Sequence, residues 1–130
     1  MTVDLAILTA TGFEQDRLQG VIAAPLCTNV ARRSWTRGTL GRQAVLLVET
    51  GVGAVNCAHA LTCLLQTHAP REVWQIGVGG AYERSGLEPG DVAVATREFY
   101  GDIGVRLDDE WQDAQETIGI PLLRSDTADG

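Results

Sequence analysis

Glycines and polar side chains gather at three places where an apolar, strand-like run gives way to a loop. These places are residues 9–14, 49–53 and 77–82. In an open α/β sheet ligands bind at the carboxyl ends of the strands, and glycine lets a ligand approach the backbone closely. A helix predicted to begin after Gly53 would point free N–H groups and the positive end of its dipole to the same region. We therefore predict a small-molecule site at these loops, suited to an anion, a sugar hydroxyl or a polarised water.

Common nucleotide and metal motifs do not explain these loops. Asn56 stands where a dinucleotide-binding fingerprint starting at Gly51 needs its third glycine, and the sequence has no G-x-x-x-x-G-K-[ST] motif. His59 and Cys63 lie four residues apart on one predicted helix face, but no further ligand stands at a suitable spacing. We therefore predict no metal and no cofactor.

Strand-like and helix-like segments alternate along the chain. Apolar runs predict strands at residues 3–8, 43–49 and 72–76, with residues 35–40 forming a hairpin with 43–49, and a further strand at 92–100. Thr11 and Glu14 have capping-box spacing ahead of a first helix, and a second helix ends before Pro70. The expected buried stripes are Phe13, Leu18, Val21 and Ile22 in the first helix, and Val55, Ala58, Leu61, Cys63, Leu64 and Leu65 in the second. Residues 108–116 are polar, and we expect them to form one short helix.

This alternation predicts an α/β fold of one domain over residues 1–130. We expect a three-layer sandwich with a central, mostly parallel or mixed twisted sheet flanked by helices. The 130 residues are 45% hydrophobic with a net charge of -7, as in an ordinary globular chain. The basic residues are scattered, which disfavours nucleic acid, and no apolar run approaches the roughly 20 residues of a membrane span. Without a signal-peptide pattern, and with three cysteines in no C-x-x-C spacing, we expect a cytoplasmic protein with reduced thiols.

Three phrases in order resemble the nucleoside phosphorylase and nucleosidase superfamily. They are Thr50-Gly-Val-Gly53 with Ala58 and Ala60, then Gly77-Val-Gly-Gly-Ala-Tyr82, then Gly86-Leu-Glu-Pro-Gly-Asp91 with Tyr100-Gly-Asp102. Within that superfamily, Thr9-Ala-Thr-Gly-Phe-Glu14 and Ile118-Gly-Ile-Pro-Leu122 are most similar to futalosine hydrolase. The resemblance covers nearly the whole chain. It implies a phosphorylase/hydrolase-like fold and hydrolysis of futalosine to hypoxanthine and dehypoxanthine futalosine in menaquinone biosynthesis.

The resemblance implies cleavage of an N-ribosidic bond through an oxocarbenium-like state, which needs an acid on the leaving base and an activated water. Glu14 matches the glutamate that deprotonates this water; the alternative is that it only completes the capping box with Thr11. The implied substrate-binding residues are Thr50, Gly51, Gly53, Val78, Gly79, Gly80 and Tyr100. Glycine-rich turns and an aromatic strand end are the alternatives for these, and Asp91 is interpreted as turn chemistry.

The sequence leaves two alternatives for the nucleophile, water and phosphate, and it lacks part of the expected site. Gln75 occupies a place where phosphorylase relatives carry an arginine, which favours water, while Arg17 keeps a phosphorylase as the alternative. The superfamily's leaving-group acid and ribose-binding glutamate have no counterpart here, and Asp126 and Asp129 follow no recognisable motif. We therefore expect an incomplete amino-terminal part that is inactive alone, prone to aggregation and homo-oligomeric when complete. A noncatalytic purine-binding fragment is a further alternative.

Overall fold

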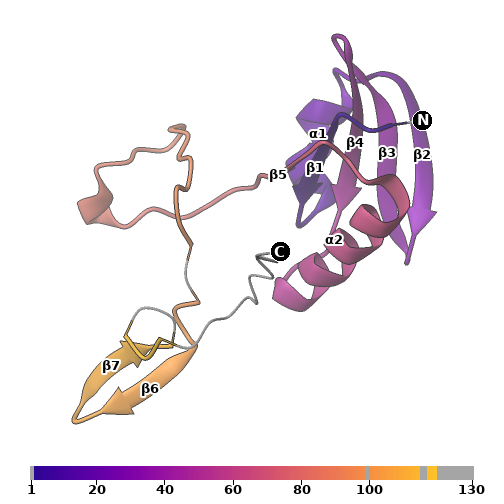
Figure 1. Ribbon diagram of the computed structural model, residues 1–130. Helices are drawn as coiled ribbons and strands as arrows, with labels where there is room; N and C mark the ends of the chain where they lie inside the picture. The colour runs from indigo at the N-terminus through magenta and orange to yellow at the C-terminus, as the bar shows by residue number, and fades with distance from the viewer. Residues whose placement is uncertain (1, 99, 115–116, 120–130) are drawn as a thin grey trace, which may run out of the picture. The chain divides into compact units, whose positions relative to one another are not determined.

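The structure is a computed structural model that describes residues 2–98, 100–114 and 117–119. It divides into two compact units, Met1–Tyr82 and Glu83–Gly130 (Figure 1). The first unit contains all three predicted loops, and the second contains Tyr100.

The first unit is built on a five-stranded mixed sheet (Figure 1). Its strands are β1 (Leu5–Thr9), β2 (Ala23–Val30), β3 (Arg33–Leu40), β4 (Gln43–Glu49) and β5 (Glu72–Gln75), in the order β2-β3-β4-β1-β5. β1 pairs in parallel with β4 on one side and with β5 on the other, while β2, β3 and β4 pair antiparallel. The predicted mixed sheet and the hairpin across Gly41 are confirmed.

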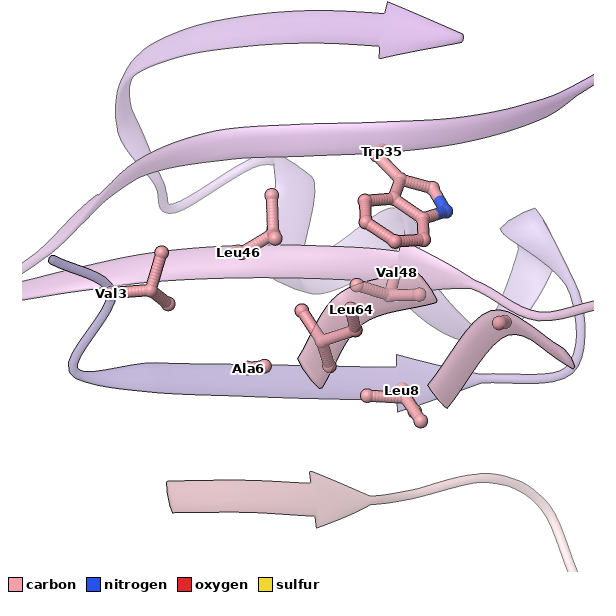
Figure 2. Packing of buried hydrophobic residues seen from close by; sticks show 8 residues of the cluster. Val3, Ala6, Leu8, Trp35, Leu46, Val48 and Leu64 are labelled. Carbon is pink, nitrogen blue, oxygen red and sulfur yellow. The ribbon is translucent and has the colours of Figure 1, made fainter. Parts of the chain in front are cut away.

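The two central strands are buried on both faces, because their side chains alternate between two apolar clusters. Ala6 and Leu8 of β1 join Leu46 and Val48 of β4 in the cluster that α2 (Ala54–His68) covers with Leu64 (Figure 2). The opposite face gathers Leu5, Ile7, Val45, Leu47 and Ile22, with Leu18 of α1 (Gly12–Gln19) packed against them. Helices therefore cover both faces of the sheet, as a three-layer sandwich requires.

The buried stripes of the helices differ in part from those predicted. In α1, Phe13 is 77% exposed because it lies across the helix from Gln15 and Leu18, which face the sheet. Val21 is also exposed, since α1 ends before it. In α2 the buried face is Cys57, Ala60, Leu61, Cys63 and Leu64, whereas Val55, Ala58 and Leu65 are exposed.

Both edge strands of the sheet are mostly exposed. β2 was not predicted; it contains Pro25, and its register with β3 shifts between Ala23 and Leu26. A proline is tolerated at such an irregularity in an edge strand, because the missing N–H interrupts no central ladder. β5 forms the other edge and ends one residue earlier than predicted.

The second unit contains η1 (Glu83–Ser85) and an antiparallel hairpin of β6 (Gly104–Leu107) and β7 (Glu110–Asp113). The hairpin turns at Asp108 and Asp109, whose φ angles of 49° and 68° are left-handed, as in type I′ turns. The helix predicted for residues 108–116 is therefore wrong over 108–114, and 115–116 lie outside the described residues. The strand predicted for 92–100 is also wrong: residues 92–98 have no strand partner and form no ladder.

Candidate functional site

The three predicted loops lie at the same end of the sheet, where the carboxyl ends of three adjacent strands come together. β4, β1 and β5 are adjacent and parallel, so residues 49–53, 9–14 and 77–82 all follow carboxyl ends on the same side. Two backbone hydrogen bonds fasten the strand ends together: Thr50 N–H donates to Thr9 O at 2.8 Å, and Ile76 N–H donates to Leu8 O at 2.9 Å. Open α/β folds bind ligands at this carboxyl end of their strands.

Glu14 joins two of these loops through its carboxylate. Its Oε2 accepts hydrogen bonds from the Thr11 N–H at 3.0 Å and the Thr11 hydroxyl at 3.2 Å, which serves the start of α1. Its Oε1 accepts a hydrogen bond from the Val78 N–H at 3.0 Å, in the loop that follows β5. The half-buried side chain therefore takes part in capping and also faces the meeting point of the loops.

These donors hold Glu14 in its ionised form. The backbone N–H of Val78 is the largest influence and lowers the carboxyl pKa below its ordinary value of 4.5; the N–H and hydroxyl of Thr11 act in the same direction against partial burial. A carboxylate that stays charged near neutral pH can orient a water molecule and accept its proton.

Gly77 makes this arrangement possible. A Cβ at this position would lie 2.6 Å from Glu14 Oε1, closer than real contacts allow, so a side chain there would displace the carboxylate. By contrast, a Cβ at Gly79 or Gly80 would meet nothing within 4 Å. The backbone of these two exposed glycines is therefore accessible to a flat ligand.

The loop after β4 has a backbone conformation that depends on its glycines. Gly51 and Gly53 have φ angles of 83° and 96°, in which a larger residue would be strained. The buried hydroxyl of Thr50 donates to Thr9 O at 3.1 Å and lies 2.9 Å from Gly51 O, so it already serves the loop itself. α2 begins after Gly53 with no side-chain cap on its free N–H groups.

Two polar side chains beside this loop were not predicted as site residues. Glu49 ends β4, and its Oε2 accepts the Ser34 N–H at 3.4 Å. Arg33 begins β3 and donates to Asn56 Oδ1 at 2.5 Å. In the sequence Arg33 was only one of a pair of arginines, because nothing in the spacing shows that β3 lies beside the loop after β4.

The remaining candidates lie elsewhere. Tyr100 belongs to the second unit and is 53% exposed, and its substrate-binding role stays a prediction. Asp91 has the predicted turn role, since its carboxylate accepts the Glu88 N–H at 2.9 Å. Asp126 and Asp129 lie outside the described residues.

The cysteines and the candidate metal pair show no further site. Cys63 Sγ is 3.9 Å from His59 Nε2, and the described part of the chain contains no group of three potential metal ligands. All three cysteines are free thiols. Within the described residues, no helix has the length and apolar character needed to cross a membrane.

Comparison with known proteins assigns the family. Residues 4–125 match the model of the phosphorylase superfamily, and the chain belongs to this family. The 5′-methylthioadenosine/S-adenosylhomocysteine nucleosidase of Anoxybacillus flavithermus is 35% identical over 103 residues, which are 79% of this chain and 44% of the relative. The nucleosidase of the same name from Bacillus thuringiensis is 31% identical over 78% of this chain and 43% of the relative. The chain thus spans less than half the length of these relatives.

Solved structures share the fold. The 5′-methylthioadenosine/S-adenosylhomocysteine nucleosidase of Colwellia psychrerythraea, solved with adenine, aligns over 65% of this chain and 35% of its own, with a TM-score of 0.59 and 24% identity. A futalosine hydrolase mutant from Helicobacter pylori aligns over 61% of this chain and 35% of its own, with a TM-score of 0.55 and 15% identity. At these identities the likeness concerns the fold alone, and it confirms the predicted architecture.

Proposed function

We propose that this chain carries the water-activating part of a nucleosidase that hydrolyses the N-ribosidic bond of a purine nucleoside. One observation carries the proposal: the ionised Glu14 carboxylate is held by Val78 N–H where the ends of β1, β4 and β5 meet. The names of the sequence relatives support it, because both are nucleosidases.

The proposed reaction needs a base and an open surface for the substrate. Glu14 takes a proton from water while the water oxygen bonds to the anomeric carbon and the bond to the purine nitrogen breaks. The purine and ribose lie along the backbone of Val78, Gly79 and Gly80, where no side chain intrudes at the glycines. We assign the proton that the leaving purine needs to a group outside the described residues.

The proposed substrates fall into two classes. The relatives at 31–35% identity favour 5′-methylthioadenosine and S-adenosylhomocysteine. Futalosine is the second candidate, because the sequences of residues 9–14 and 118–122 resemble futalosine hydrolase and one such enzyme shares the fold. The two classes release different bases: adenine from 5′-methylthioadenosine and S-adenosylhomocysteine, and hypoxanthine from futalosine.

The test uses two proteins: the 130-residue chain, and a fusion of this chain to the part of the Anoxybacillus flavithermus nucleosidase that follows the matched region. Purine release from the three nucleosides is followed by chromatography. We expect no turnover by the chain alone, because a missing general acid typically costs about 10²- to 10⁴-fold, and we expect turnover by the fusion. Turnover by the chain alone would show that it contains its own acid, and a soluble, folded fusion without turnover would contradict the proposal.

Phosphate distinguishes hydrolysis from phosphorolysis. If water is the nucleophile, the fusion releases the purine at the same rate with and without phosphate, and the sugar product is the 5-substituted ribose with a hydroxyl on its anomeric carbon. If release requires phosphate and yields a ribose 1-phosphate, the protein is a phosphorylase. The fusion also tests the proposed homo-oligomer by light scattering.

A further inference from the structure

The start of β3 is fastened to the loop that follows β4. The backbone N–H of Ser34 donates to the Glu49 carboxylate at 3.4 Å, at the last residue of β4. The preceding residue, Arg33, contacts Gly51 and reaches Asn56 in the first turn of α2. Two neighbouring residues therefore hold the segment between β4 and α2 at both ends.

The Arg33 guanidinium covers Gly51. A Cβ added to Gly51 would lie 2.8 Å from Nε, 3.1 Å from Nη2 and 3.2 Å from Cζ of Arg33, so the guanidinium packs directly on the glycine. Glycine is thus needed at position 51 for two reasons: its φ of 83° would strain a larger residue, and a Cβ would clash with the Arg33 guanidinium. The same guanidinium donates from Nη2 to Asn56 Oδ1 at 2.5 Å.

Asn56, the hydrogen-bond partner of Arg33, also bonds to the loop. Its Nδ2 donates to Val52 O at 2.6 Å, and the next residue, Cys57, donates its N–H to Gly53 O at 3.0 Å. The contacts of Arg33 with Gly51 and Asn56, together with the Asn56 bond to Val52, form a clasp around the loop. Among the described residues, the bond to Asn56 is the one hydrogen bond of the Arg33 side chain.

We propose that Arg33 is a positioning residue that sets the conformation of residues 50–53 through Asn56. Its consequence for turnover rests on the proposed function and on the substrate-binding role that the family resemblance implies for Thr50, Gly51 and Gly53. Arg33 is only half-buried and belongs to neither apolar cluster, so the clasp acts on the loop rather than on the core. A planar guanidinium can pack on Gly51 and donate to Asn56 at the same time, which an ammonium group does poorly.

The first test is hydrogen exchange of the 130-residue chain, without substrate, at the N–H groups of Thr50 and Cys57. We expect Arg33→Met and Asn56→Ala to speed exchange at both about tenfold, with Arg33→Lys in between. Arg32→Met is the matched control, since Arg32 is exposed and adjacent. Unchanged exchange in Arg33→Met, or equal acceleration throughout β1 and β4, would overturn the proposal.

The second test is kinetic and uses the fusion. A misplaced binding loop weakens ground state and transition state alike, so Arg33→Met should raise KM about tenfold with kcat within about twofold, and Arg33→Lys should restore part of KM. A fall in kcat with KM unchanged would contradict positioning. A fusion that lacks turnover would overturn the proposed function, while the exchange result would still decide the role of Arg33.

Discussion

The Glu14 carboxylate accepts the backbone N–H of Val78 at 3.0 Å, across 64 residues of sequence. This bond links the first turn of α1, which follows β1, to the loop that follows the neighbouring strand β5. A ligand lying along the backbone at residues 78–80 is therefore next to a charged carboxylate.

Adding a methyl group at Gly77 should raise the pKa of Glu14. In Gly77→Ala the new Cβ would fall 2.6 Å from Oε1 and push the carboxylate off Val78 N–H, the largest cause of the lowered pKa. The pKa should then rise toward 4.5, as measured by NMR titration of the Glu14 side-chain carbon. Gly79→Ala is the control, because its Cβ meets nothing within 4 Å. Equal pKa values in the two variants would refute the steric account.

The same bond should make stability depend on pH. Because the folded-state pKa of Glu14 is lowered, its contribution is present above the unfolded value near 4.5 and is lost as pH falls through the folded pKa. Glu14→Gln removes this titration. Urea unfolding at about pH 6 and about pH 3 should therefore show a larger loss of stability on acidification for the wild type than for the variant. Equal losses would mean that Glu14 has the same pKa folded and unfolded.

Gln15 should be a destabilising residue. Its side chain is fully buried at 0% exposure, and Nε2 has no hydrogen-bond partner among the described residues, while Oε1 accepts from Gln19 at 3.3 Å. An unsatisfied buried amide costs more than the single bond contributes, so Gln15→Met should raise the free energy of unfolding by about 1 kcal/mol. Gln66→Met, on the exposed side of α2, should change it little. Destabilisation of Gln15→Met in urea would indicate that Nε2 has a partner.

Leu64 should carry much of the packing between α2 and the sheet. It is 0% exposed, whereas its neighbour Leu65 is 50% exposed. Leu64→Ala should lower the free energy of unfolding by about 2–5 kcal/mol, and Leu65→Ala by less than about 1 kcal/mol. Chemical denaturation of the two variants measures the difference. Similar losses would mean that α2 does not pack on the sheet through Leu64.

The sequence predicted the central strands because their signal is local. Residues 5–8 and 45–48 are continuous apolar runs, as strands buried on both faces require. β2 was missed because its residues are exposed and include Pro25, so pairing with β3 and not composition makes it a strand. Residues 92–98 show the reverse: valines favour a strand there, but a strand forms only with a partner.

The site was predictable where it depends on strand ends and not where it depends on packing across the sheet. The position of Glu14 follows from a local cap and a parallel sheet, so the sequence indicated its region. Its bond to Val78 and the contact of Arg33 with Gly51 join residues from distant segments. Spacing along the chain contains no sign of either contact.

Glu14 is the proposed base that activates water, and kcat of the fusion with Glu14→Gln tests this role. Glutamine keeps the size of the side chain but cannot take a proton, so kcat for purine release should fall at least about 100-fold. Asp16→Asn, a like change at an exposed position of the same helix, should leave kcat unaltered. Undiminished purine release by the Glu14→Gln fusion would show that Glu14 is not the base.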